Sequence, residues 1–271
     1  VHPVILSIIF MIKIENISFS YPVEHGEVHP ILEDVSLEIH PGESIVVMGH
    51  NGSGKTTFAR CLNGLLTPSA GRILVDDFDT SNEEHILKIR RRVGMVFQNP
   101  DNQIVSTTVE RELAFGLENL GIDYDTMHEI VNTMLDKFNL SHYRKHPPHN
   151  LSGGEKQRLA LAAVMAMSPR YLVLDEPTSL LDPGNRKLIL NIVESLHQND
   201  KTQTPITTIL ITQFPEEALS ADRLLVFNKG RLALDSAPRD IFQQKKELKE
   251  MGLEPPLSIR VHEMLEKYIQ Y

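Results

Sequence analysis

Gly49-His-Asn-Gly-Ser-Gly-Lys-Thr56 is the most informative segment of this 271-residue chain. It fits the pattern G-x-x-x-x-G-K-[ST], in which the backbone N–H groups of a glycine-rich loop surround phosphate oxygens. The segment follows the apolar run Ser44-Ile-Val-Val-Met48 and precedes a helical stretch over residues 56–63. A helix N-terminus carries partial positive charge that favours a bound anion. The sequence therefore predicts a phosphate-binding loop between a buried strand and a helix.

Each residue of this loop is a candidate nucleotide contact. Lys55 should reach the terminal phosphates, and the hydroxyl of Thr56 should bind Mg²⁺. The full set of expected contacts is Gly49, His50, Asn51, Gly52, Ser53, Gly54, Lys55, Thr56 and Thr57.

A second candidate element is Tyr171-Leu-Val-Leu-Asp-Glu176, an apolar strand with two acids at its end. Asp175 can hold Mg²⁺, and Glu176 can orient and deprotonate an attacking water, as phosphoryl transfer to water requires. Apolar runs followed by two acids are common at strand ends. The assignment therefore depends on the phosphate-binding loop as well.

The third element is Leu151-Ser-Gly-Gly-Glu-Lys-Gln157. Its residues Ser152, Gly153 and Gly154 should open a helix over residues 155–167 and present a hydroxyl and backbone donors to an anion. This segment closely resembles the LSGGQ signature of the ATP-binding-cassette (ABC) ATPases, with Glu155 in place of the usual glutamine. The resemblance covers nearly the whole chain from Met11 onward.

The resemblance implies an α/β fold, a P-loop NTPase ABC cassette with a mainly parallel core sheet, an N-terminal antiparallel β subdomain and an inserted helical subdomain. It implies ATP and Mg²⁺ as ligands, and a head-to-tail dimer in which the signature caps the γ-phosphate held by the partner subunit. By the same resemblance, Tyr21 stacks on adenine, Gln98 touches Mg²⁺ and the water, and Asp182 lies in a loop that contacts the other subunit. An ordinary tyrosine at a strand end is the alternative for Tyr21.

One position departs from the family. After the apolar run over residues 208–211 the family places a histidine that contacts the γ-phosphate, whereas this chain has Gln213. A glutamine amide still donates a hydrogen bond but carries no positive charge. Loss of one such donor costs on the order of 10²–10³ in rate, and we expect the lower end of that range or less because a donor is kept.

The rest of the chain predicts the domain organisation. Residues 11–235 should form the cassette, with the helical subdomain at about residues 99–168, and residues 236–271 a C-terminal helical extension that makes a dimer contact. Short apolar runs near residues 93–97, 171–174, 208–211 and 224–227 suit buried parallel strands. Apolar residues alternate with polar ones, as in half-buried antiparallel strands, at Ile12, Ile14, Ile17, Phe19, Val35, Leu37 and Ile39.

The first ten residues are expected to belong to neither part. Their apolar run, residues 4–10, lacks the basic start and cleavage site of a signal peptide, and we expect Met11 to be the working start. A real edge strand or a partner-binding arm is the alternative.

Composition excludes several classes of protein. With 27 basic and 36 acidic residues the net charge is −9, which argues against a broad nucleic-acid-binding surface. The single cysteine, Cys61, excludes a disulfide framework and a cysteine-based zinc site. The apolar runs fall far short of the roughly 20 residues that span a bilayer. The histidines show no metal-ligand spacing, so no zinc is expected.

Two further segments narrow the resemblance. Phe97-Gln-Asn-Pro-Asp-Asn-Gln-Ile-Val-Ser106 and the tail Gly252-Leu-Glu-Pro-Pro-Leu-Ser-Ile259 look like those of the ATPases of energy-coupling-factor importers and of related cobalt/nickel importers. This implies a second ABC ATPase subunit of the same or a paralogous chain, a transmembrane scaffold subunit docked on residues 99–116, and a substrate-binding membrane subunit. The chain would then work at the cytoplasmic face of the cell membrane in uptake of a vitamin or a transition-metal ion.

Alternatives stay open at this stage. The chain can be a soluble ABC ATPase that does no transport, or an attenuated ATP-binding partner in a heterodimer. The apolar residues of the expected docking segment, Ile104, Val105, Leu113 and Phe115, can equally be core residues. The cargo is not encoded here, because its contacts belong to another chain.

Overall fold

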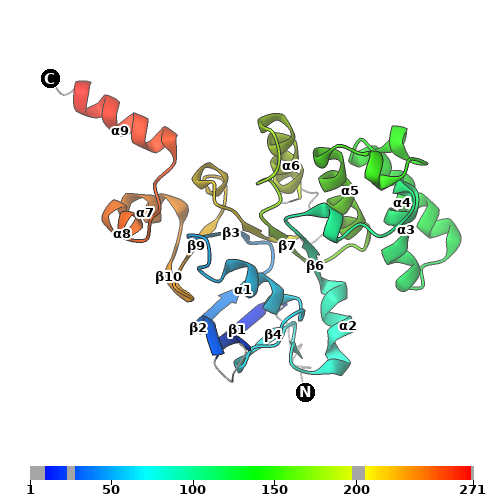
Figure 1. Ribbon diagram of the computed structural model, residues 1–271, viewed down its shortest axis with the longest axis horizontal. Coiled ribbons are helices and arrows are strands. Elements are labelled where there is room, and N and C mark those ends of the chain that lie inside the picture. The colour runs from blue at the N-terminus through cyan, green and yellow to red at the C-terminus, as the bar shows by residue number, and fades with distance from the viewer. Residues whose placement is uncertain (1–9, 23–27, 197–204, 270–271) are drawn as a thin grey trace, which may run out of the picture.

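The computed structural model describes residues 10–22, 28–196 and 205–269. A small antiparallel sheet, a larger mixed sheet and a helical lobe lie side by side, and a C-terminal arm extends from them (Figure 1). The expected α/β cassette with an antiparallel subdomain is confirmed.

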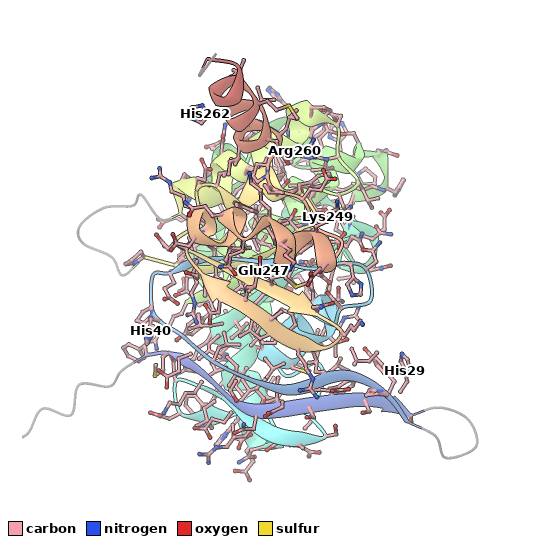
Figure 2. All side chains as sticks on the ribbon, turned by 90° about the vertical axis from the view of Figure 1, so that its left-hand side faces the viewer. His29, His40, Glu247, Lys249, Arg260 and His262 are labelled. Carbon is pink, nitrogen blue, oxygen red and sulfur yellow. The ribbon has the colours of Figure 1, made fainter. Side chains whose placement is uncertain are left out.

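The antiparallel sheet has the strand order β2-β1-β4-β5. Its register pairs Ile12 with Ile39 and Ile14 with Leu37, so the alternating apolar side chains of both strands share one buried face. In Figure 2, His29 lies near the start of β2 and His40 directly follows its end. The strands are β1 (Ile12–Pro22), β2 (Val28–Ile39), β4 (Ala70–Val75) and β5 (Phe78–Asp79).

The larger sheet has the order β10-β9-β3-β8-β7-β6, and all its pairs are parallel except β10 with β9. The parallel strands are short and buried, as their continuous apolar runs predict. Their carboxyl ends meet at one edge, where ligands bind in open α/β sheets. The strands are β3 (Ser44–Met48), β6 (Val93–Val96), β7 (Tyr171–Asp175), β8 (Thr207–Ile211), β9 (Arg223–Asn228) and β10 (Arg231–Ser236).

Helix α1 (Lys55–Leu62) lies between the two sheets (Figure 1). Its apolar residues Phe58 and Leu62 are fully buried in one core cluster with Ile12 of β1 and Ile45 of β3. Helix α2 (Glu83–Arg92) runs from β5 to β6 along the side of this core. Helix α1, which begins at the phosphate-binding loop, is therefore packed against both sheets.

The chain between β6 and β7 is helical and forms the lobe at the right of Figure 1. Its main helices are α3 (Val109–Asn119), α4 (Tyr124–Lys137) and α5 (Gly153–Ala166), with short 3₁₀ turns η2 (Pro100–Asn102), η3 (Ser141–Tyr143) and η4 (Pro148–Asn150). Leu113 is fully buried and Ile104 is partly buried against the core, whereas Val105 and Phe115 are 66% and 48% exposed. The segment that the sequence analysis expects to receive a scaffold subunit thus contains both core residues and surface residues.

Helix α6 (Pro183–Ser195) covers the larger sheet, and η5 (Pro215–Ala218) follows β8. The C-terminal arm contains α7 (Pro238–Gln243), α8 (Lys245–Glu250) and α9 (Leu257–Ile269). Figures 1 and 2 show α9, marked by Arg260 and His262, standing away from the body of the molecule. Its apolar positions are exposed: Leu257, Val261, Met264 and Leu265.

Residues 1–9, on which the expectation of an upstream extension falls, lie outside the described part of the chain. Phe10 is described, and the guanidinium of Arg170 lies 3.9 Å from its ring centroid. No helix among the described residues is both long and apolar enough to cross a membrane.

Candidate active site

The phosphate-binding loop joins β3 to α1, as the sequence predicts. Lys55 is buried, and its Nζ donates hydrogen bonds to the carbonyl oxygens of Gly49 at 2.8 Å and of His50 at 3.1 Å. An ammonium group has three donors, so one remains for a phosphate oxygen. Burial lowers the pKa of Lys55, and the carboxylates of Glu176 and Asp175 oppose that shift.

Two glycines are required by the path of this loop. A Cβ at Gly49 would lie 2.3 Å from the carbonyl oxygen of Phe227, so only glycine fits there. Gly54 has a φ of +101° and offers no side chain to cap α1. The first-turn N–H groups of α1 therefore lack a side-chain cap and can serve an anion.

The loop, the segments that follow β6, β7 and β8, and Ile31 of β2 line a cavity of about 450 Å³. The cavity brings together segments that are far apart in the sequence, because the carboxyl ends of parallel strands meet at one edge. Its lining residues are Ile31, Asn51, Gly52, Gly54, Lys55, Thr56, Thr57, Gln98, Glu176 and Gln213.

Not every expected nucleotide contact lines this cavity. Gly49 and Ser53 lie inside the loop, where Ser53 is fully buried. His50 is exposed, and its Nδ1 lies 2.6 Å from the carbonyl oxygen of Asn51. Tyr21 is half-buried at the end of β1 and packs edge-on against Phe19, with ring centroids 4.9 Å apart.

The two acids at the end of β7 differ in setting. Asp175 is buried, and its Oδ1 accepts a hydrogen bond of 3.0 Å from Oγ1 of Thr56. Glu176 adopts φ +48°, a conformation that costs free energy in a non-glycine residue and concentrates at functional sites. Burial raises the pKa of both carboxyl groups, while Lys55 acts in the opposite direction.

The groups around Thr56 and Asp175 suit Mg²⁺, a hard cation that takes oxygen ligands. No group of three or more His, Cys, Asp or Glu side chains that could hold a metal was found in the described residues. Mg²⁺ needs no such group, because it commonly binds one or two carboxylates together with substrate phosphates and water. The hydroxyl of Thr56, already 3.0 Å from Asp175, and the amide oxygen of Gln98 complete a suitable donor set.

Gln98 lies just past β6 and reaches the catalytic candidate directly. Its Nε2 donates hydrogen bonds to Oε2 of Glu176 at 3.1 Å and to Oγ of Ser179 at 3.2 Å. The Ser179 hydroxyl in turn donates to the carbonyl oxygen of Glu176 at 3.0 Å. Ser179 is thus a site residue that the sequence reasoning missed, although it stands only three positions after Glu176.

Gln213 follows β8 and is exposed at the rim of the same cavity as Glu176. The backbone explains the proximity: the N–H of Glu176 donates to the carbonyl oxygen of Ile211 at 3.0 Å, so the ends of β7 and β8 are joined. The structure therefore brings Gln213 to the same cavity as Lys55 and Glu176, and its contact with the terminal phosphate stays a prediction.

The signature segment begins α5, outside the loop cavity. Ser152 is exposed and caps the helix: its Oγ accepts a hydrogen bond of 3.4 Å from the N–H of Glu155, and its own N–H donates to Oε2 of Glu155 at 2.7 Å. The hydroxyl of Tyr143 donates to Oε1 of Glu155 at 2.6 Å and, with burial opposing, lowers the pKa of this carboxyl. Gly153 is exposed and open, whereas a Cβ at Gly154 would collide with Asn185.

The reciprocal bonds of Ser152 and Glu155 form a capping box, which the spacing S-x-x-E would have predicted. Asp182 caps α6 in a similar way and accepts hydrogen bonds from the N–H groups of Gly184 at 3.0 Å and Asn185 at 3.1 Å. Both residues thus have a structural role within the chain. Any role toward a second subunit comes in addition to it.

Comparison with known proteins agrees with this geometry. The model of the ABC transporter family matches residues 32–179. The energy-coupling factor transporter ATP-binding protein EcfA1 of Clostridium perfringens is 45% identical over 91% of this chain and 86% of its own length. The protein of the same name from Listeria monocytogenes is 44% identical over 94% of this chain and 88% of its own.

Solved structures show the same similarity. The structure of cbiO1 from Clostridium perfringens, described as part of the ABC transporter complex cbiONQ, has a TM-score of 0.77 and 32% identity, and the match covers 95% of this chain and 99% of that one. A bacterial ABC transporter cassette solved as a dimer has a TM-score of 0.76 and 26% identity over 84% of this chain and 99% of its own. The chain therefore belongs to the ABC transporter family, as an ATP-binding ATPase cassette.

Proposed function

We propose that this chain is the ATP-hydrolysing subunit of an energy-coupling-factor type importer, which drives uptake of a vitamin or a transition-metal ion through a separate transmembrane subunit. The cavity between the phosphate-binding loop, Glu176 and Gln213 carries this proposal, because it brings a carboxylate held by Gln98 to the phosphate-binding loop. The similarity to EcfA1 proteins supports the transport context.

In the proposed chemistry, the loop N–H groups and Lys55 bind the β- and γ-phosphates of ATP. Glu176 orients a water molecule in line with the γ-phosphorus and accepts its proton as the bond from phosphorus to the bridging oxygen breaks. The products are ADP and phosphate. Mg²⁺, held by Thr56, Asp175 and Gln98, would neutralise charge on the phosphate oxygens. Gln98 holds one oxygen of Glu176, which leaves the other free for the water.

The signature segment serves a second nucleotide in this proposal. The start of α5, with Ser152 and Gly153, is exposed and does not line the chain's own loop cavity, so it can cap the γ-phosphate held by a partner subunit. Tyr21 would stack on adenine, and Asp182 would lie at the subunit interface. The partner is a second copy or a paralogous ATPase.

Val105 and Phe115 are exposed apolar residues of the helical lobe, which follows Gln98 in the chain. Their exposure supports docking of a transmembrane scaffold subunit on residues 99–116. The exposed apolar face of α9 supports a dimer contact by the C-terminal extension, residues 236–271. A substrate-binding membrane subunit would select the cargo. The chain would then lie at the cytoplasmic face of the cell membrane.

Co-purification tests the transport proposal. A tagged chain recovered from detergent-solubilised membranes should bring an integral membrane protein in stoichiometric amount, and Val105→Asp with Phe115→Asp should release that protein while leaving ATP binding intact. Recovery of the wild-type chain with no integral membrane partner would favour an ABC ATPase that does no transport.

Gln213 favours one variant of the proposal, in which this chain is an attenuated ATP-binding partner in a heterodimer. Purifying the chain alone and comparing its hydrolysis with that of Glu176→Gln separates the cases. Equal rates for both would place hydrolysis in the other subunit.

A further inference from the structure

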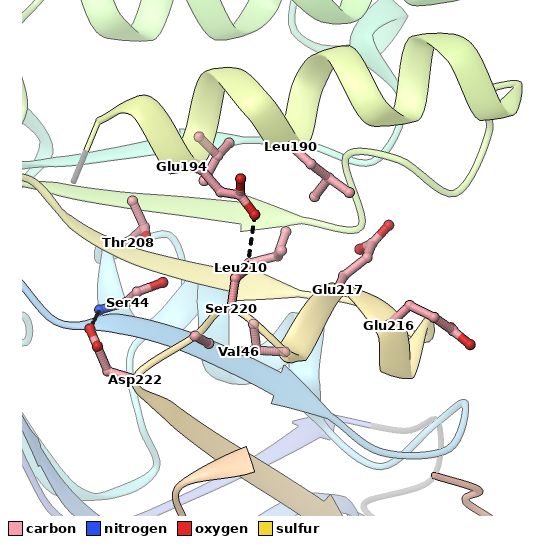
Figure 3. A pocket seen from close by; sticks show the side chains of 12 residues that line it. Ser44, Val46, Leu190, Glu194, Thr208, Leu210, Glu216, Glu217, Ser220 and Asp222 are labelled. Carbon is pink, nitrogen blue, oxygen red and sulfur yellow. Dashed lines mark hydrogen bonds between the residues drawn. The ribbon is translucent and has the colours of Figure 1, made fainter. Parts of the chain in front are cut away.

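The short turn after Gln213 carries two adjacent acids with different surroundings. Glu217 on η5 is buried, with 7% of its surface exposed, whereas Glu216 is exposed. Both line a cavity of about 280 Å³ between α6 and the larger sheet. Figure 3 shows the two side chains leaving η5 in different directions, with Glu217 directed toward α6, which carries Leu190.

Glu217 contacts the segment that follows the catalytic candidate. Its Oε1 accepts a hydrogen bond of 2.8 Å from Oγ1 of Thr178, a buried residue two positions after Glu176. The same oxygen lies 3.9 Å from Nε of Arg186 on α6. Glu217 therefore contacts the segment after β7 at two residues, Thr178 and Arg186.

Arg186 also contacts the segment that follows β8, which contains Gln213. Its guanidinium lies 3.6 Å from the ring centroid of Phe214, the residue next to Gln213. The chain leaving β7 and the chain leaving β8 are thus tied through Thr178, Arg186, Glu217 and Phe214. Glu176 is the first residue of the segment after β7, and Gln213 lies at the start of the segment after β8. Both residues line the same cavity.

Two polar atoms in the cluster of Thr178, Arg186, Glu217 and Phe214 lack a hydrogen-bond partner in the described part of the chain. Oε2 of Glu217 and Nε of Arg186 are both buried and have no hydrogen-bond partner among the described residues. A buried carboxylate of this kind is costly unless it is paired. An apolar residue of similar size would serve packing alone at lower cost. Because Oε2 of Glu217 is free to accept a further hydrogen bond, the carboxylate can keep a bond to Thr178 or Arg186 while the segments after β7 and β8 shift relative to each other.

We propose that Glu217 is a positioning residue for ATP hydrolysis, which sets the spacing between Gln213 and Glu176 by holding Thr178 and Arg186. This inference rests on the proposed roles of Gln213 and Glu176. Glu217 itself is not among the residues that line the nucleotide cavity. Its effect should therefore fall on turnover and leave nucleotide affinity alone.

The test measures kcat, KM and ATP affinity of the full chain with all subunits that co-purify. Glu217→Ala should lower kcat between about 10- and 100-fold, the scale expected for misplacing catalytic groups by an ångström or less. ATP affinity should stay within about twofold, since loop contacts are intact. Glu217→Gln keeps an acceptor for Thr178 and should recover most of the lost rate.

Thr178→Val supplies an independent arm, because it removes the hydroxyl that Glu217 binds at nearly constant volume. It should lower kcat as Glu217→Ala does, and the double variant should lose no more than either single one, as for residues that act as a unit. Thr178→Ser keeps this hydroxyl and should therefore have a higher kcat than Thr178→Val, close to that of the wild type. If Glu217→Ala does not fold, Thr178→Val and Thr178→Ser carry the test.

Glu194→Gln is the matched control. Glu194 lines the same cavity and accepts a hydrogen bond of 2.9 Å from the Ser220 hydroxyl (Figure 3). In the described part of the chain it makes no hydrogen bond or ion pair with Thr178 or Arg186, so this substitution should leave kcat unchanged. Unchanged kcat in Thr178→Val and Glu217→Ala, or a loss of ATP affinity in step with kcat, would overturn the positioning role. Continued hydrolysis by Glu176→Gln would instead overturn the proposed site chemistry.

Discussion

Nε2 of Gln98 donates a hydrogen bond of 3.1 Å to Oε2 of Glu176. The bond joins the first residues past β6 to the end of β7, and therefore links the helical lobe to the candidate catalytic carboxylate. We therefore expect movement of the lobe to change the orientation of Glu176 through this bond. Gln98 also bonds Ser179, so the amide is held at two places.

Replacing Gln98 should slow hydrolysis. Gln98→Ala removes the donor that orients Glu176, and general-base catalysis depends on such positioning, so we expect kcat to fall at least about tenfold. Steady-state phosphate release by the assembled complex measures the change. Ser179→Ala, which keeps the bond between Gln98 and Glu176, should have a smaller effect. Equal losses in the two variants would contradict a direct role for the Gln98 bond.

Restoring the histidine of the family at position 213 should raise activity. Gln213→His adds a side chain that can carry positive charge toward the terminal phosphate, and we expect a rise in kcat of up to about tenfold. The rate should be compared with Glu176→Gln under the same conditions. Attenuation by Gln213 is wrong if Gln213→His leaves the rate unchanged while Glu176→Gln abolishes it.

Asp76 should be important for stability without taking part in the chemistry. Its buried carboxylate accepts bonds from Arg92 at 3.0 Å, Arg170 at 2.8 Å and the Tyr171 hydroxyl at 2.6 Å, which join the two sheets. Asp76→Ala leaves those donors unpaired and should lower the free energy of unfolding by about 3 kcal/mol, as for breaking a buried pair. Urea denaturation measures this, and a loss below that of a surface control such as Asp125→Ala would count against the network.

The Cys61 thiol should be unreactive in the folded chain. Burial raises its pKa to about 12, so almost no thiolate forms near pH 8.5. Iodoacetamide should modify it only after unfolding in urea. Because the folded-state pKa is raised, the stability linked to the neutral thiol is complete below pH 9 and falls as pH rises from about 9 toward 12. Fast modification of the native chain at pH 8.5 would contradict this burial.

The sequence predicted those parts of the molecule that depend on local pattern. The phosphate-binding loop, Asp175 and Glu176 were found because a strand, a turn and a helix follow one another within a few residues. The alternating apolar residues of β1 and β2 likewise identified an antiparallel sheet, which the register of Ile12 with Ile39 confirms.

Contacts between distant residues could not be predicted in this way. Thr178 and Glu217 are 39 positions apart, and Asp76 and Tyr171 are 95 apart, so no periodicity relates them. The helix α9 was expected from its apolar spacing, but the spacing does not say what covers Leu257 and Met264. The proposed roles of Tyr21, Ser152 and Asp182 involve a nucleotide or a second chain, which a single sequence does not encode.

The central claim is that Glu176, held beside the phosphate-binding loop and Gln98, activates the water that attacks ATP. The most direct measurement is ATP hydrolysis by the Glu176→Gln chain, together with its equilibrium affinity for ATP. We predict that hydrolysis falls by at least about 10²-fold while ATP affinity is unchanged or stronger. Hydrolysis at the wild-type rate by a Glu176→Gln chain that still binds ATP would contradict the account.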